Sequence, residues 1–65
     1  MNPLDTRPPE EGVFHCTIDV LLVYADGHTA KGYQDGWTGW MRWRENGWPG
    51  PVEDDAEQPI GWRLP

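Results

Sequence analysis

Four of the five tryptophans of this 65-residue chain lie within residues 36–50. Glycines at positions 36, 39 and 47 interrupt this stretch, and Pro49 closes it. A helix is therefore disfavoured, because each internal glycine costs about 1 kcal/mol relative to alanine and a proline removes a backbone donor. We expect a β-strand over residues 37–44, in which successive side chains point to opposite faces of a sheet.

The predicted strand has two different faces. The face that we expect to be buried in the core carries Trp37, Gly39, Met41 and Trp43. The other face carries Trp40, Arg42 and Arg44. An indole between two guanidinium groups is compatible with an internal cation–π arrangement and also with a surface that contacts a partner, and both interpretations stay open here.

Two further strands and three turns are indicated around this stretch. Residues 14–25 alternate in polarity and become apolar on both faces in their second half, as in a central strand. Residues 28–34 are expected to form the returning strand. The turn signals, whose residues tolerate positive φ angles, are Asp26-Gly27, Asp35-Gly36 and Asn46-Gly47. The sequence thus predicts a single all-β or β-dominant domain over residues 1–65, an antiparallel meander of three to four strands.

The two ends of the chain are expected to be less regular. Prolines hold residues 1–12 in an extended arm, and Leu4 is its one obvious apolar anchor. Residues 51–58 form an acidic segment that is compatible with a helical turn or with an open loop, and we expect the loop. Residues 60–64 should form a last short strand that closes the core with Ile60, Trp62 and Leu64.

The chain is acidic, with eleven Asp and Glu residues against five Lys and Arg residues and a net charge of −6. Direct binding to nucleic acid is disfavoured, because affinity for the phosphate backbone comes from Lys and Arg. A basic protein is a better partner. The carboxylates that we expect to contact it are Glu53, Asp54, Asp55, Glu57, Asp26 and Asp35, with Glu10 and Glu11 as further members. The competing interpretation is that these acids are solvated loop residues.

Catalytic and metal-binding motifs do not emerge from the sequence. His15 and Cys16 are neighbours, so on a strand they face opposite directions and cannot act as a pair. One cysteine and two histidines do not supply the ligand spacing of a structural zinc site. We expect His28 to be an exposed turn residue and Cys16 a small buried one. The sequence therefore predicts no catalytic residue, no cofactor and no metal site.

The same features suggest a compartment. A single cysteine forms no internal disulfide, which fits a reducing environment. No apolar run approaches the roughly 20 residues that span a bilayer, and no secretory leader is recognisable. We therefore expect a cytoplasmic protein without a membrane partner.

Four short motifs follow one another along the chain in an order that can be compared with known families. They are Pro-Pro-Glu-Glu-Gly at residues 8–12, Val-Leu-Leu-Val-Tyr-Ala-Asp-Gly at 20–27, Gly-Tyr-Gln-Asp-Gly-Trp at 32–37 and Gly-Trp-Arg-Leu-Pro at 61–65. The layout resembles a family of short phage and prophage proteins of unknown function, with a Leu-Pro-Glu-Glu-Gly start and a closing Trp-x-x-Leu-Pro. The chain departs from that pattern at Pro8, in the inserted residues 14–18 and in the acidic run 53–57. Because the family has no assigned activity, the resemblance implies a phage-type protein and carries over no functional residue.

A phage origin would imply a class of roles. By size and acidity alone, the chain resembles anti-CRISPR and anti-restriction inhibitors, some of which mimic DNA with carboxylates. We therefore expect a non-enzymatic inhibitor, monomeric or homodimeric, that binds a basic host protein or ribonucleoprotein complex. The alternatives are a small peptide- or carbohydrate-binding module that uses Trp40, Arg42 and Arg44, and an accessory or structural phage protein.

Overall fold

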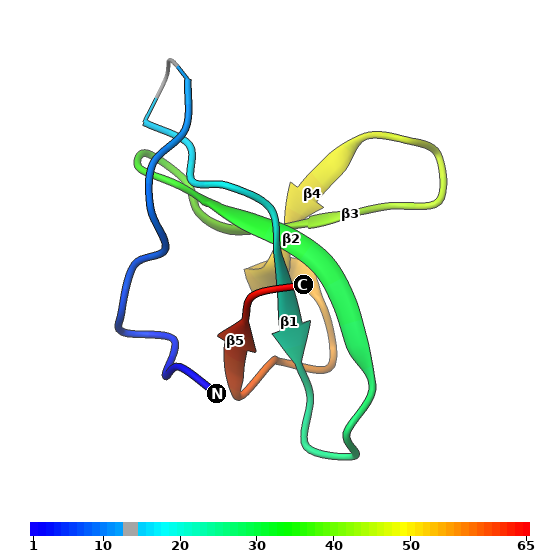
Figure 1. Cartoon of the computed structure of the whole chain (residues 1–65). Helices are drawn as coiled ribbons and strands as arrows, with labels where there is room; N and C mark the ends of the chain where they lie inside the picture. The colour runs from blue at the N-terminus through cyan, green and yellow to red at the C-terminus, as the bar shows by residue number, and fades with distance from the viewer. Residues whose placement is uncertain (13–14) are drawn as a thin grey trace.

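One antiparallel β-sheet dominates the computed structural model, which describes residues 1–12 and 15–65 (Figure 1). Its elements are β1 (Val20–Val23), β2 (Thr29–Asp35), β3 (Gly39–Trp43), β4 (Pro49–Pro51), the 3₁₀ turn η1 (Val52–Asp54) and β5 (Gly61–Arg63). The strand order across the sheet is β4-β3-β2-β1-β5. The predicted all-β meander is confirmed, because β1 to β4 are consecutive neighbours and β5 returns to pair with β1.

The sheet has five strands, more than the three to four expected, because the short segment after the third turn also pairs, as β4. β4 begins and ends with proline, which is tolerated in a sheet only where its missing N–H is not needed, as at an edge. The segment after β4 contains the 3₁₀ turn η1, where we expected only an open loop. The Gln58 side chain stabilises this segment by donating hydrogen bonds to the carbonyl oxygens of Val52 (2.8 Å) and Asp55 (2.9 Å).

The first and third predicted hairpins are confirmed and share one geometry. The backbone N–H of Tyr24 donates to His28 O (3.0 Å), and that of Arg44 donates to Trp48 O (2.9 Å). In both turns the glycine has a positive φ, 92° at Gly27 and 86° at Gly47. Only glycine adopts this conformation without strain, so the Asp-Gly and Asn-Gly pairs determine both turns.

The middle hairpin differs from the expectation in where its second strand begins. Asp35 Oδ1 accepts hydrogen bonds from the backbone N–H groups of Trp37 (2.8 Å) and Thr38 (3.4 Å), which holds both residues in the turn. β3 therefore starts at Gly39, and Trp37 is not a core residue. Its indole is 82% exposed.

The pairing register decides which tryptophan of β3 faces the core. Gly32 of β2 pairs with both Val20 of β1 and Arg42 of β3. Residues opposite each other in a sheet share a face, so Arg42 lies on the side of the buried Val20, and so does Trp40 two residues earlier. The predicted core face of this strand is wrong: Trp40 packs against the core, and Trp43 lies on the opposite face, called the outer face below.

The core is small and lies on the other side of the sheet from Trp43. Its buried apolar residues are Val20, Leu22, Tyr24, Val52 and Trp62. From the C-terminal segment, only Trp62 joins it as predicted, because β5 spans three residues and leaves Ile60 and Leu64 exposed.

The N-terminal arm is held to the core by two indoles. Trp40 Nε1 donates to Leu4 O (3.1 Å), and Trp62 Nε1 donates to Thr6 O (3.1 Å). Asn2 and Trp62 also exchange backbone hydrogen bonds of 2.7 and 2.8 Å, so the arm covers the free edge of β5. The predicted anchor Leu4 does pack against the core.

The long strand expected over residues 14–25 is replaced by the shorter β1 and a preceding segment. Phe14, the expected start, lies outside the described residues. Thr17 forms an isolated bridge with Glu10 of the arm and donates its backbone N–H to Gln34 O (2.9 Å). This segment therefore joins the arm to the end of β2.

Both edges of the sheet are protected against further strand pairing. Proline residues occupy the first and last positions of β4 at one edge, and Asn2 pairs along β5 at the other. Such features discourage edge-to-edge association. Within residues 1–12 and 15–65, no helix is long and apolar enough to cross a membrane.

Candidate functional site

Asp55 lies between two arginines instead of facing a partner. Its carboxylate accepts hydrogen bonds from Arg42 Nε (3.1 Å) and Arg44 NH1 (2.7 Å), and its side chain is 17% exposed. Burial by itself would raise the pKa of Asp55, but the hydrogen bonds from Arg44 and Arg42 outweigh it and hold the pKa below its ordinary value. The residue is thus an internal counter-ion for two of the few cations of the chain.

The two arginines are equally part of the architecture. Arg44 NH2 donates a further hydrogen bond to Pro51 O (3.0 Å). Its guanidinium lies across Gly50, where an added Cβ would stand 2.4 Å from Arg44 Nε. Together with Trp40, which contacts the arm, both arginines lie on the core side of β3. The structure therefore places all three residues of the predicted aromatic set among internal contacts.

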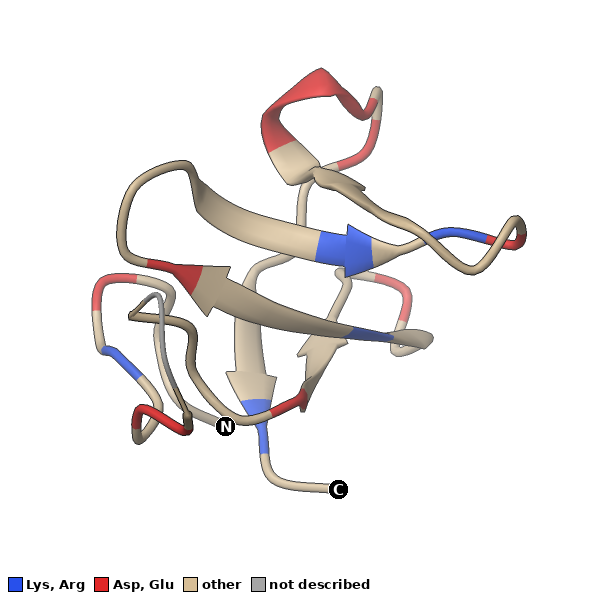
Figure 2. Cartoon of the chain, turned by 90° about the horizontal axis from the view of Figure 1, so that it is seen from above, with Lys and Arg blue, Asp and Glu red and all other residues tan. Residues whose placement is uncertain are grey.

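The other predicted acids separate into two groups. Glu53 and Asp54 are exposed on η1 and form no hydrogen bond or ion pair with any described residue, and Glu57 follows them in the same segment (Figure 2). Asp26, in the β1–β2 turn, lies close to Glu57. Asp35 lies at the far end of the seven-residue strand β2, roughly 20 Å away at ~3.3 Å per residue, where it holds the middle hairpin. Asp35 thus does not belong to the same surface.

His28 joins Asp26 to Glu57. Asp26 Oδ1 accepts hydrogen bonds from the backbone N–H of His28 (3.0 Å) and from His28 Nδ1. On the other side of the ring, Nε2 lies 3.5 Å from Glu57 Oε1. The imidazole stacks on the Tyr24 ring, with centroids 4.3 Å apart and planes at 5°. The three ligand atoms of Asp26, His28 and Glu57 lie within 4.8 Å of one another.

This cluster borders a surface cavity of about 400 Å³. The cavity is lined by Tyr24, His28, Thr29, Ala30, Arg42, Asp55, Ala56 and Glu57. Its lining therefore includes both the His28–Glu57 contact and the Arg42–Asp55 ion pair.

A second candidate surface lies on the outer face of the sheet. The rings of Tyr33 on β2 and Trp43 on β3 are 5.7 Å apart and tilted by 47°. Trp43 Nε1 donates to Asp19 Oδ1 (3.0 Å), and Lys31 Nζ lies 3.5 Å from Asp19 Oδ2. We call Tyr33 and Trp43 the outer aromatic pair. Trp43 is exposed, so the pair presents a fixed ring surface to solvent.

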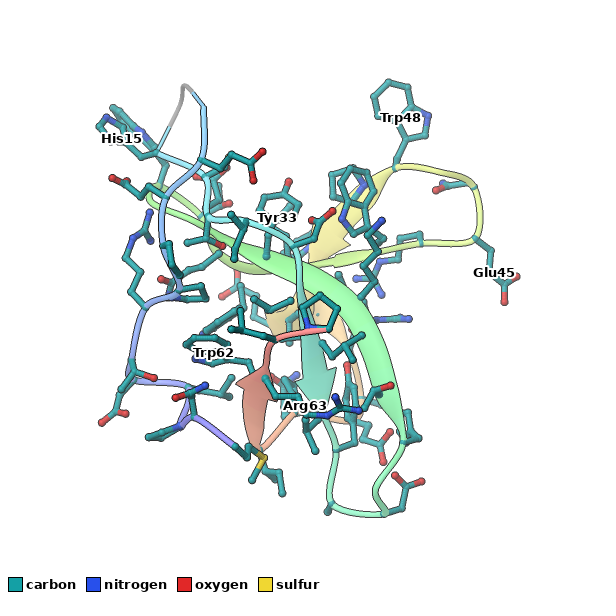
Figure 3. The ribbon with its side chains drawn as sticks, in the orientation of Figure 1. His15, Tyr33, Glu45, Trp48, Trp62 and Arg63 are labelled. Atoms are coloured by element: carbon teal, nitrogen blue, oxygen red, sulfur yellow. The ribbon has the colours of Figure 1, made fainter. Side chains whose placement is uncertain are left out.

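Trp48 is a further exposed ring, in the β3–β4 hairpin. It closes the β3–β4 hairpin, is 74% exposed, and projects away from the ribbon in Figure 3. Pro49, the next residue, is paired with Trp43 across the two strands. Exposed indoles are frequent binding hot spots, because one ring offers a large contact area with few rotatable bonds.

Cys16 does not have the surroundings of a reactive thiol. Burial raises the pKa of Cys16, and the adjacent Asp35 carboxylate raises it further. The Sγ atom lies 3.8 Å from Asp35 Oδ2. Because a thiol reacts as the thiolate, these neighbours disfavour its use as a nucleophile.

The candidate sites therefore differ from those expected on the basis of the sequence. The sequence predicts the Asp26-Gly27 turn and an exposed His28 beside it. It does not predict their contact with Glu57, which depends on where the fold places the acidic segment. The chain matches no protein-family model, no curated protein and no solved structure.

Proposed function

We propose that this chain is a non-enzymatic binding domain that captures another protein through the outer aromatic pair, Tyr33 and Trp43. The observation that supports this most directly is an exposed indole that is fixed in place without being part of the core. Trp43 lies outside the core and is 37% exposed, and tryptophan is enriched among the residues at the centre of interfaces.

The outer aromatic pair is organised before any partner binds. The hydrogen bond from Trp43 Nε1 to Asp19 and the contact with Tyr33 define the orientation of the indole. A ring that is already ordered loses little side-chain entropy on binding, so more of its contact energy appears as affinity. The protected sheet edges make strand addition a less suitable binding mode than side-chain contact.

Trp43→Ala and Tyr33→Ala should each reduce partner capture by at least about tenfold while leaving the domain folded, because loss of a hot-spot ring costs about 2 kcal/mol or more. The measurement is an affinity pull-down from host lysate, with mass spectrometry of the retained proteins. Capture should persist at high salt, because an apolar contact is hardly screened.

Trp37→Ala provides the matched control. Trp37 is a more exposed indole, but it lies in the β2–β3 turn away from the outer aromatic pair. If Trp37→Ala removes the same proteins as Trp43→Ala, the retention is unspecific adhesion to tryptophan and the proposal is wrong.

A second candidate function uses the acidic side of the molecule. It is supported by the convergence of Asp26 and Glu57 and by the exposed carboxylates of Glu53 and Asp54, which pair with no described residue. We propose, as this second candidate, a phage-type inhibitor that engages a basic nucleic-acid-handling protein of the host in its cytoplasm, in the manner of anti-CRISPR or DNA-mimicking proteins. Complementary charge would provide fast association and specificity there.

The double variant Glu53→Gln with Asp54→Asn should abolish capture by this second route and leave the melting temperature almost unchanged, since both side chains are exposed. Glu45→Gln, in the β3–β4 turn labelled in Figure 3, changes charge elsewhere and serves as control. Capture through the acidic side should also weaken when salt is raised. Retention that survives the double variant at both salt concentrations excludes this candidate.

A further inference from the structure

His28 has a carboxylate at each of its two ring nitrogens. Asp26 Oδ1 accepts from Nδ1 and from the backbone N–H, while Glu57 Oε1 lies 3.5 Å from Nε2. An aspartate carboxylate is ionised at neutral pH and can only accept hydrogen bonds. The Nδ1 atom therefore carries a hydrogen.

This arrangement leaves an acceptor facing an acceptor. In a neutral imidazole with hydrogen on Nδ1, the lone pair on Nε2 is directed toward the Glu57 carboxylate. Neither group then has a hydrogen to share, and either a proton on Nε2 or a metal cation bound by both groups makes the contact favourable.

We propose that His28 Nε2 and Glu57 bind a divalent transition-metal ion, with Asp26 orienting the imidazole through Nδ1. Zinc binds a histidine nitrogen or a carboxylate oxygen at about 2.0–2.2 Å, so two tetrahedral ligands are about 3.4 Å apart. The observed separation of 3.5 Å matches this spacing. A carboxylate that holds the second ring nitrogen of a metal-binding histidine is a recurrent arrangement, because it fixes the tautomer and raises ligand basicity.

Tyr24 lies beside these ligands. Its ring stacks on the His28 imidazole and lines the same cavity. No buried side-chain nitrogen or oxygen of the described residues lacks a hydrogen-bond partner, so the Tyr24 hydroxyl, which bonds to none of those residues, is open to solvent in the cavity. The other charged residues of the cavity, Arg42 and Asp55, neutralise each other.

The ligand set indicates which ions are suitable. Imidazole with carboxylate and water, without a thiolate, favours Zn²⁺, Ni²⁺ or Cu²⁺ over the oxygen-preferring Mg²⁺ and Ca²⁺. A bound ion would connect the β1–β2 turn to the segment after η1, two parts of the chain that are otherwise distant in sequence.

Calorimetric titration of the full chain with ZnCl₂ at neutral pH tests this site, with MgCl₂ as the comparison salt. We expect saturable binding of one Zn²⁺ per chain, at least about tenfold weaker in His28→Gln and Glu57→Gln and about 10–100-fold weaker in Asp26→Asn. NMR spectra should show that zinc shifts the His28 ring signals in the native chain and that every variant is folded.

His15→Gln is the matched control, since His15 is the other histidine and its Nδ1 lies 3.5 Å from Glu10 Oε1. Its removal should leave zinc affinity unchanged. The proposal is overturned if zinc binds equally well without His28, or if both histidine variants lose affinity to the same extent. It is also overturned if the folded native chain shows no saturable zinc binding, because a proton or water then occupies the position between Nε2 and Glu57.

Discussion

Trp62→Ala is expected to leave much of the protein unfolded at 37 °C. Removing a buried tryptophan costs about 3–5 kcal/mol. A domain of this length has a total stability of only about 3–10 kcal/mol at 0.05–0.15 kcal/mol per residue. Trp62 is 6% exposed and is one of the five buried apolar residues in the described part of the core, so removing its ring leaves a large cavity there.

The same substitution also releases the N-terminal arm. Trp62 Nε1 donates to both Thr6 O (3.1 Å) and Thr6 Oγ1 (3.2 Å), and the Trp62 backbone exchanges two hydrogen bonds with Asn2. Once the arm is released, the outer edge of β5 is open and the adjacent core is exposed to water. We therefore expect loss of the ring and loss of the arm to act together.

Chemical denaturation followed by circular dichroism measures the first effect, and amide exchange at Asn2 measures the second. Trp62→Phe separates the two contributions, because it keeps a ring but lacks the N–H donor. It should cost about 1–2 kcal/mol and accelerate exchange at Asn2. Trp48→Ala, which removes an exposed indole, should change stability by less than about 0.5 kcal/mol. Equal losses for Trp62→Ala and Trp48→Ala would contradict the assignment of the core.

The hairpins could be predicted from the sequence because their causes are local. In two of them a glycine with positive φ follows Asp26 or Asn46, and the preceding side chain also accepts a hydrogen bond from the residue after the glycine. All the groups involved lie within five consecutive residues. Such patterns can be recognised without knowing the rest of the fold.

The faces of β3 could not be predicted in the same way. A strand that begins at 37 and one that begins at 39 contain the same alternating residues, and the choice of buried face depends on pairing with β2. The residue types on the two faces do not decide which face is buried. An arginine such as Arg42 can lie on the core side of a strand when an acid such as Asp55 neutralises its charge. A register difference of one residue exchanges the core and outer faces of a strand.

The candidate site could not be derived from spacing because its members come from distant segments. Asp26 and His28 belong to a turn that was predicted, but Glu57 is 29 residues beyond His28 in a segment without regular secondary structure. Asp55, two residues before Glu57, is directed at Arg44 instead. Neighbouring acids thus have opposite surroundings, and only the fold distinguishes them.

Asp55→Asn is expected to lower the melting temperature by roughly 10–20 °C. Removing one member of a buried ion pair costs about 3–5 kcal/mol, because the other charge is left without compensation. Arg42 and Arg44 are still a quarter to a third exposed, so we expect a smaller loss of about 2–3 kcal/mol. In a domain of this size each kcal/mol corresponds to about 4–8 °C. Asp54→Asn is the matched control, since Asp54 is exposed and should shift the melting temperature little.

Comparing the native chain with Asp55→Asn at different pH values shows whether the stability is lost because the charge of Asp55 is lost. The arginine hydrogen bonds hold the pKa of Asp55 in the folded state below the ordinary value of 3.8, so its stabilisation is fully present above that pH. As the pH falls below 3.8 and through the folded-state pKa, the carboxylate is protonated and the contribution is lost. The difference in unfolding free energy between the native chain and Asp55→Asn should therefore be constant from pH 5 to 7 and decrease at lower pH. A difference that persists unchanged in acid would show that Asp55 acts through packing and not through its charge.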